Sequence, residues 1–183
     1  MKIKSGKAQD LIDEQFLKER KIFLWGEVEG TSAKHVMERL VYLDSQSSDE
    51  IQLFINSPGG FVTDGFAIYD TMQSLKSPVS TICTGLAASM GSILLSGGAK
   101  GRRFIQKHAK VMIHQPSGGT RGQASNIEIQ AAEILKIKDL SAKILAENCG
   151  QTVEKILKDF NRDYWMDDKE SIAYGIVDDV YKP

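Results

Sequence analysis

Residues 79–95 read VSTICTGLAASMGSILL, and this stretch decides the fold class. The run VSTIC is rich in apolar and β-branched residues, as a buried strand is. Gly85 predicts a turn after that strand, and the small and apolar residues AASMGSILL predict a helix beyond the turn. A buried strand that leads directly into a helix is typical of α/β proteins.

The segments on both sides repeat this alternation of strand and helix. The longest helical pattern covers residues 124–148, and Gly150 follows it as the expected terminating glycine. Asp167 and Glu170 have the spacing of a capping box, and Ser32 is an expected helix cap. Other strand-like runs lie at 21–25, 51–56, 102–106, 109–114 and 176–181. No repeat or flexible linker divides the chain, so we predict one α/β domain over residues 1–183.

Composition excludes several classes of protein. The chain has 183 residues, of which 42% are hydrophobic and 26% charged, as in an ordinary globular domain. Its formal net charge of −1 lacks the basic excess of nucleic-acid-binding proteins, and we interpret the basic run at 100–110 as a solvated hairpin. Cys83 and Cys149 have no metal-ligand spacing, so the sequence predicts no metal and a reducing compartment.

We expect neither a secretory signal nor a membrane-spanning segment. The opening residues MKIKSGKAQD lack the apolar segment of a secretory signal, so we expect a cytoplasmic protein. Residues 79–99 carry no charge and would be long enough to cross a bilayer, but four glycines, four serines and two threonines dilute them. A buried strand-turn-helix explains this stretch better than a membrane span.

Ser89 is the first candidate for chemistry. It follows the predicted strand and precedes the predicted helix, where free backbone N–H groups favour developing negative charge. Small neighbours, Ala88 and Gly91 among them, would let a substrate carbonyl approach the hydroxyl. A serine that only caps the helix remains an alternative.

A serine nucleophile needs a base and an oxyanion site. Of the three histidines, His35 and His108 lie among charged residues, whereas His114 ends the apolar run 111–113 and precedes a proline. A buried structural histidine is the alternative for His114. The turn Ser57-Pro58-Gly59-Gly60 could supply backbone N–H donors, or it could be only a tight strand-to-helix turn.

The carboxylate that would orient the imidazole cannot be chosen by spacing. Asp163 lies beside aromatic residues that could partly bury it, which favours it modestly over the other acidic residues of this region. Those alternatives are Asp159, Asp167, Asp168, Asp178 and Asp179.

Four motifs in order resemble the proteolytic subunit of the Clp protease over about residues 11–181. They are INSPGG at 55–60, GLAASMGS at 85–92, MIHQPSGG at 112–119 and RDYWM at 162–166. The resemblance implies a serine endopeptidase with Ser89 as nucleophile, His114 as general base and Asp163 as the acid that orients it. It also implies an oxyanion hole made by the backbone N–H groups of Gly60 and Met90.

The same resemblance implies a fold and an assembly. The fold would be a crotonase-like α/β domain, with residues 117–148 projecting as a handle made of a helix and a glycine-containing strand. Two stacked rings of seven subunits would enclose a chamber, into which an AAA+ unfoldase ATPase threads unfolded polypeptides. The subunit itself would need no cofactor.

Three departures from the family's usual pattern keep alternatives open. The segment 1–10 is short, Asn161 stands where an acid is usual, and MDDK at 166–169 replaces small residues. They motivate the hypothesis of a paralogous subunit that works in a mixed ring, or one whose site is idle. A crotonase-like acyl-CoA enzyme is a remote alternative, because such enzymes usually rely on Glu or Asp rather than a Ser/His pair.

Overall fold

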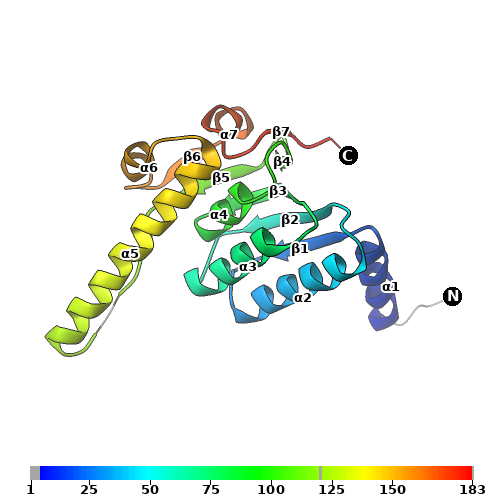
Figure 1. Ribbon diagram of the computed structural model, residues 1–183, viewed down its shortest axis with the longest axis horizontal. Coiled ribbons are helices and arrows are strands. Elements are labelled where there is room, and N and C mark those ends of the chain that lie inside the picture. Colours follow the sequence, from blue (N-terminus) through cyan, green and yellow to red (C-terminus); the bar gives the residue numbers. More distant parts are fainter. Residues whose placement is uncertain (1–4, 120, 183) are drawn as a thin grey trace.

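The computed structural model describes residues 5–119 and 121–182, which form an α/β fold (Figure 1). The helices are α1 (Ser5–Lys18), α2 (Gly30–Gln46), α3 (Val62–Ser74), α4 (Met90–Ser96), α5 (Ala124–Cys149), α6 (Val153–Asp159) and α7 (Asp168–Tyr174). The strands are β1 (Lys21–Trp25), β2 (Ile51–Ser57), β3 (Val79–Ala88), β4 (Arg103–Ile105), β5 (Lys110–Ile113), β6 (Tyr164–Met166) and β7 (Asp179–Val180).

A mixed sheet forms the centre of the molecule. Strands β1, β2, β3, β4 and β7 are parallel neighbours in that order. The long strand β3 changes partner along its length, since residues 81–83 pair with β4 and residues 86–88 pair with β5. Strand β6 then pairs with β5 in the antiparallel direction. The C-terminal ends of β3 and β5 and the N-terminal end of β6 therefore lie close together.

The turn predicted at Gly85 is wrong, because β3 continues through this residue to Ala88. The side-chain oxygen of Asn56 accepts a hydrogen bond from the Leu86 N–H at 3.0 Å. A Cβ atom on Gly85 would lie only 2.7 Å from that oxygen. The glycine therefore makes room for the Asn56 side chain within the sheet, and the helix begins only at Met90.

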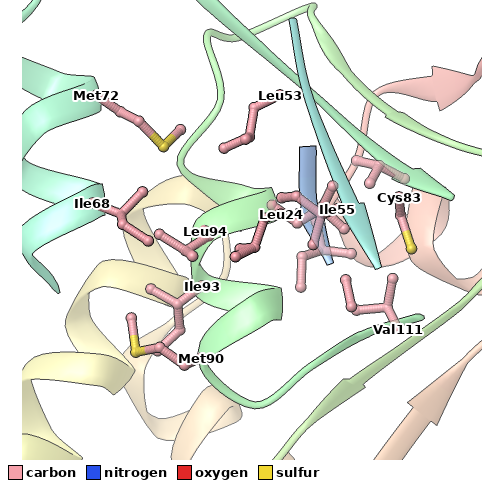
Figure 2. Packing of buried hydrophobic residues seen from close by; sticks show 14 of the residues in the cluster. Leu24, Leu53, Ile55, Ile68, Met72, Cys83, Met90, Ile93, Leu94 and Val111 are labelled. Atoms are coloured by element: carbon pink, nitrogen blue, oxygen red, sulfur yellow. The ribbon is translucent and has the colours of Figure 1, made fainter. Parts of the chain in front are cut away.

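The core lies between this sheet and the helices α2, α3 and α4, which run side by side along one of its faces (Figure 1). Ile68 and Met72 project from α3 toward Leu94 of α4, and Leu53 and Ile55 face the same region from β2 (Figure 2). Ile55, Ile68 and Leu94 have no exposed surface. This packing holds α4, and with it the residue before α4, in a fixed position on the sheet.

The long helix α5 projects away from the rest of the molecule (Figure 1). The helix predicted over 124–148 is confirmed, and it ends at Gly150, whose φ is 67°. The strand expected in the handle is not formed by residues 117–119 or 121–123, and Thr120 lies outside the described residues. A strand is defined by a hydrogen-bonded neighbour, and the described part of the chain supplies none along this segment.

The N-terminal segment and the two predicted helix caps can be compared with the structure. Of the N-terminal segment 1–10, residues from Ser5 onward belong to α1, and residues 1–4 lie outside the described part. Helix α2 starts before Ser32, so this serine is not its cap; its hydroxyl instead accepts from the N–H of Glu29, the capping residue. The capping box of Asp167 and Glu170 is confirmed.

Within residues 5–119 and 121–182, no helix has the length and apolarity needed to cross a bilayer.

Candidate active site

Ser89 lies at the junction of β3 and α4 in a strained backbone conformation. Its φ of 53° and ψ of −122° are unusual for a residue other than glycine. The N–H of Ser89 donates to the Met112 carbonyl at 2.9 Å, and the Ser89 carbonyl accepts from the N–H of Ser92 at 3.0 Å. The residue is thus fixed on both sides, and no side-chain hydrogen bond makes it a helix cap.

His114 comes close to Ser89 because of the parallel pairing of β3 with β5. Ala88 is opposite Met112 in the register, so the residues that follow both strands emerge at the same edge. His114 Nε2 lies 2.8 Å from Ser89 Oγ, within hydrogen-bonding distance. The His114 side chain is one-quarter exposed, so the imidazole is reachable from solvent and is not a core histidine. His35 on α2 and His108 between β4 and β5 are both exposed.

Asp163 lies on the other side of the imidazole. The antiparallel register pairs Ile113 with Tyr164, so His114 and Asp163 occupy the next opposed positions beyond that pair. Asp163 Oδ1 is 3.3 Å from His114 Nδ1. The aromatic neighbours do not bury the carboxylate as expected, since its side chain is 60% exposed. Tyr164 and Trp165 are themselves exposed, by 37% and 53%.

The other acidic candidates have different surroundings. Asp159 accepts hydrogen bonds from Lys155 and Tyr174, and Asp167 caps α7. Asp178 pairs with the buried guanidinium of Arg103, whose Nη2 is 2.5 Å from Asp178 Oδ1. Asp168 is the first residue of α7, and Asp179 starts β7. Among the described carboxylates, only Asp163 forms an ion-pair contact with a histidine.

The glycine turn after β2 lies against the start of α4. A Cβ atom on Gly59 would be 2.7 Å from Ser89 Cβ and 3.0 Å from the Met90 nitrogen. A Cβ atom on Gly60 would meet the Val28 carbonyl oxygen, so glycine is required at both positions. The carbonyl of Gly59 accepts from the Val28 N–H at 2.8 Å, which anchors the turn. The Gly59 backbone and the Met90 nitrogen therefore lie close to one another beside Ser89.

Two residues that support this arrangement were not foreseen. The Gln115 N–H donates to the Phe160 carbonyl at 2.6 Å, and its side-chain amide donates to the Asn161 carbonyl at 3.0 Å. These contacts hold the loop that carries Asp163. The buried hydroxyl of Ser57 accepts from the Gly59 N–H at 3.1 Å and shapes the glycine turn. In the sequence, the only indication of a role for Gln115 is that it follows His114. The only indication for Ser57 is that it lies just before the Gly59-Gly60 pair.

Both cysteine side chains are buried. Burial raises the pKa of the Cys83 thiol to about 11, so it is protonated at neutral pH. Cys149 is also buried and unpaired. Within residues 5–119 and 121–182, no three His, Cys, Asp or Glu side chains gather as a metal site.

A hydroxyl, an imidazole and a carboxylate in sequence, next to backbone N–H groups, form an arrangement suited to acyl transfer. A family model for the Clp protease matches residues 4–183 of this chain. The chain therefore belongs to the Clp protease family, as a peptidase of its proteolytic-subunit type. This match favours a peptidase over the crotonase-like acyl-CoA enzyme.

Proposed function

We propose that this protein is a serine endopeptidase that cleaves peptide bonds through an acyl-enzyme, with Ser89 as its nucleophile. The observation that carries the proposal is the 2.8 Å distance between Ser89 Oγ and His114 Nε2. A serine hydroxyl attacks a carbonyl efficiently only when a base removes its proton during attack, and imidazole suits that role near neutral pH.

In the proposed mechanism His114 moves one proton between the reacting groups. Asp163 accepts the Nδ1–H of the imidazole, which leaves Nε2 free to accept the Ser89 proton. The hydroxyl oxygen attacks the carbonyl carbon, and the imidazolium then donates its proton to the leaving amine. Water attacks the resulting ester in the second half of the reaction, again with His114 as base.

The backbone N–H groups of Gly60 and Met90 would stabilise the oxyanion. The closeness of the glycine turn to the Met90 nitrogen supports this role, since donors from two segments can converge on one oxygen. Both are main-chain groups held by anchored segments, so little reorganisation is needed as negative charge develops. In this proposal the subunit needs neither a cofactor nor a metal for the reaction.

We further propose that the subunit works as a single domain within stacked heptameric rings and receives unfolded polypeptides from an AAA+ ATPase. Helix α5 supports an assembly, because it projects from the body and exposes four large apolar side chains. These are Ile127, Ile129, Leu135 and Leu140. The two buried, unpaired thiols suit a reducing compartment such as the cytoplasm.

A mixed ring with a paralogous subunit is the second candidate, and Asn161 favours it. The side chain of Asn161 is uncharged and exposed, and its amide oxygen accepts a hydrogen bond from the Gln115 side-chain amide of the same subunit at 3.4 Å. The resemblance to the Clp protease implies an acid here that pairs with Arg162 between rings, and the uncharged Asn161 cannot form that ion pair. Under this alternative the purified chain forms a smaller particle whose peptidase activity requires the second subunit.

Cleavage of a short fluorogenic peptide by the purified chain tests the proposal, with particle mass measured by light scattering in the same sample. We expect Ser89-dependent cleavage by a particle of about fourteen subunits, and loss of several orders of magnitude in Ser89→Ala. Wild-type activity in Ser89→Ala would refute the assignment. An inactive, smaller particle would favour the mixed ring.

A further inference from the structure

A hollow lies beside His114, between the segment that follows β5 and the loop that joins α6 to β6 (Figure 1). It is lined by residues 114–117 and 161–163, and its volume is about 230 Å³. A single water molecule needs roughly 10–15 Å³, so the hollow has room for a complete amino-acid side chain. Neither Ser89 nor Met90, the proposed oxyanion donor, belongs to its lining.

The position of this hollow indicates which part of a substrate it would receive. In the proposed mechanism the imidazole of His114 donates its proton to the leaving amine, so the residue that follows the cleaved bond must pass close to the imidazole. The hollow contacts His114 but does not contact Ser89 or Met90, which hold the acyl part of the substrate. It therefore lies on the leaving-group side of the bond.

Arg162 supplies a positive charge to the hollow. Its side chain is exposed, and within residues 5–119 and 121–182 its guanidinium forms no ion pair with a carboxylate. Other arginines of the protein are paired: Arg102 contacts Glu50, and Arg103 contacts Asp178. The charge of Arg162 is thus available to a ligand.

The charges around the hollow leave Arg162 without a counter-ion during the reaction. Asp163 is the only acidic residue in the described lining, and its Oδ1 atom lies 3.3 Å from His114 Nδ1. When His114 takes the Ser89 proton, the imidazolium and the Asp163 carboxylate offset one another. Asn161, which also lines the hollow, is uncharged. The remaining positive charge of Arg162 is complementary to a carboxylate, which a guanidinium binds through two parallel hydrogen bonds.

We propose that Arg162 binds a carboxylate of the substrate immediately after the cleaved bond. This inference rests on the proposed peptidase function. The carboxylate is the side chain of an aspartate or glutamate, or the free C-terminus of a short leaving peptide, because both present the same pair of oxygens. Since Arg162 is exposed, the gain in affinity is moderate, about three- to tenfold. The substrate class is polypeptides with a negative charge just beyond the cleaved bond.

The test uses peptidyl α-ketoamides that carry one amino acid on the leaving-group side. The Ser89 oxygen bonds to the keto carbon, its proton passes to His114 and the keto oxygen becomes the oxyanion, so the compound occupies the site without being cleaved. Four compounds differ only in that amino acid: amidated glutamate, amidated glutamine, glutamine with a free carboxyl group, and amidated lysine. For each, the concentration that halves the rate of Ser89 labelling by a fluorophosphonate is measured on the full chain by intact mass spectrometry.

A carboxylate in the compound should strengthen binding. We expect amidated glutamate, free-carboxyl glutamine or both to bind about three- to tenfold more tightly than amidated glutamine, and amidated lysine to bind more weakly. A preference for glutamate identifies a side-chain carboxylate as the ligand, and a preference for free-carboxyl glutamine identifies the chain terminus. The preference should shrink in about 1 M salt, because salt screens exposed charges.

Variants of Arg162 locate the preference. Arg162→Gln should make the carboxylate compounds bind no better than amidated glutamine, and Arg162→Glu should favour lysine over glutamate. Lys158→Gln is the matched control, because it removes the same charge from an exposed residue of α6 outside the hollow and should leave the ratios unchanged. A displaced Asp163 would weaken all four compounds alike, so the ratios separate charge recognition from a structural effect.

Two failures are distinguishable. If the fluorophosphonate labels Ser89 but neither carboxylate compound binds better than amidated glutamine, or if Arg162→Gln keeps the preference, the carboxylate inference is wrong and the proposed function stands. If the fluorophosphonate does not label Ser89, the proposed function fails and the carboxylate inference fails with it.

Discussion

Replacing Gly59 by alanine should damage the site without altering any side chain that takes part in the reaction. The Gly59 φ is +97°, a conformation that L-residues rarely adopt. The new methyl would lie 2.7 Å from Ser89 Cβ, 2.9 Å from the Ala88 carbonyl oxygen and 3.0 Å from the Met90 nitrogen. All three neighbours belong to backbone or to a fixed Cβ atom, so the turn and the start of α4 must move apart.

The magnitude follows from two separate costs. Backbone strain at a positive φ costs about 1–3 kcal/mol, and overpacking costs about 1–3 kcal/mol more. The free energy of unfolding should therefore fall by about 2–6 kcal/mol. Displacement of an oxyanion donor lowers kcat by about 100-fold or more.

The assay combines urea unfolding with peptide hydrolysis in the same preparation. Gly30→Ala is the matched control, because a methyl on Gly30 meets no atom within 4 Å. It should keep both stability and kcat. If folded Gly59→Ala cleaves peptide with wild-type kcat, the glycine turn is not part of the catalytic site.

Three further predictions concern charge and burial. Asp163→Asn should lower kcat by about 10- to 100-fold. This is less than the loss expected for a buried triad acid, because the Asp163 carboxylate is 60% exposed. Steady-state kinetics of this variant, compared with the wild type and with Ser89→Ala, measure the loss. Burial raises the pKa of Asp178, but hydrogen bonds from Arg103 outweigh it and lower the pKa overall, so its stabilisation is complete above about pH 4 and is lost as the pH falls below that value. Urea unfolding against pH should therefore show a smaller loss below pH 4 in Asp178→Asn than in the wild type, and equal losses would contradict this. Burial raises the pKa of the Cys149 thiol to about 12 and that of Cys83 to about 11, so neither should react with iodoacetamide at pH 8 until urea unfolds the chain.

Much of the fold could be predicted because hydrophobic periodicity is a local property. The long helix from residue 124 and the capping box at Asp167 are confirmed within a residue or two. The turn at Gly85 was mispredicted because the glycine serves a contact with Asn56, which lies on the neighbouring strand. Local sequence does not indicate such a partner.

Some residues of the candidate site could be chosen from the sequence and others could not. The sequence could single out Ser89 and His114 as candidates, since each follows an apolar strand at a point where side chains become accessible. The choice of Asp163 among six carboxylates depends on the antiparallel register of β5 and β6, a long-range pairing that spacing cannot reveal. The expected burial of Asp163 was wrong because its aromatic neighbours are themselves exposed.

The most direct test of the central claim is covalent labelling of Ser89. The purified full chain is treated with a fluorophosphonate, and the modified residue is identified by peptide mass spectrometry in the wild type and in His114→Ala. The account predicts modification of Ser89 in the wild type and a rate lowered by about 100-fold or more in His114→Ala. An equal rate in both proteins, or no modification of Ser89 in the wild type, would contradict it.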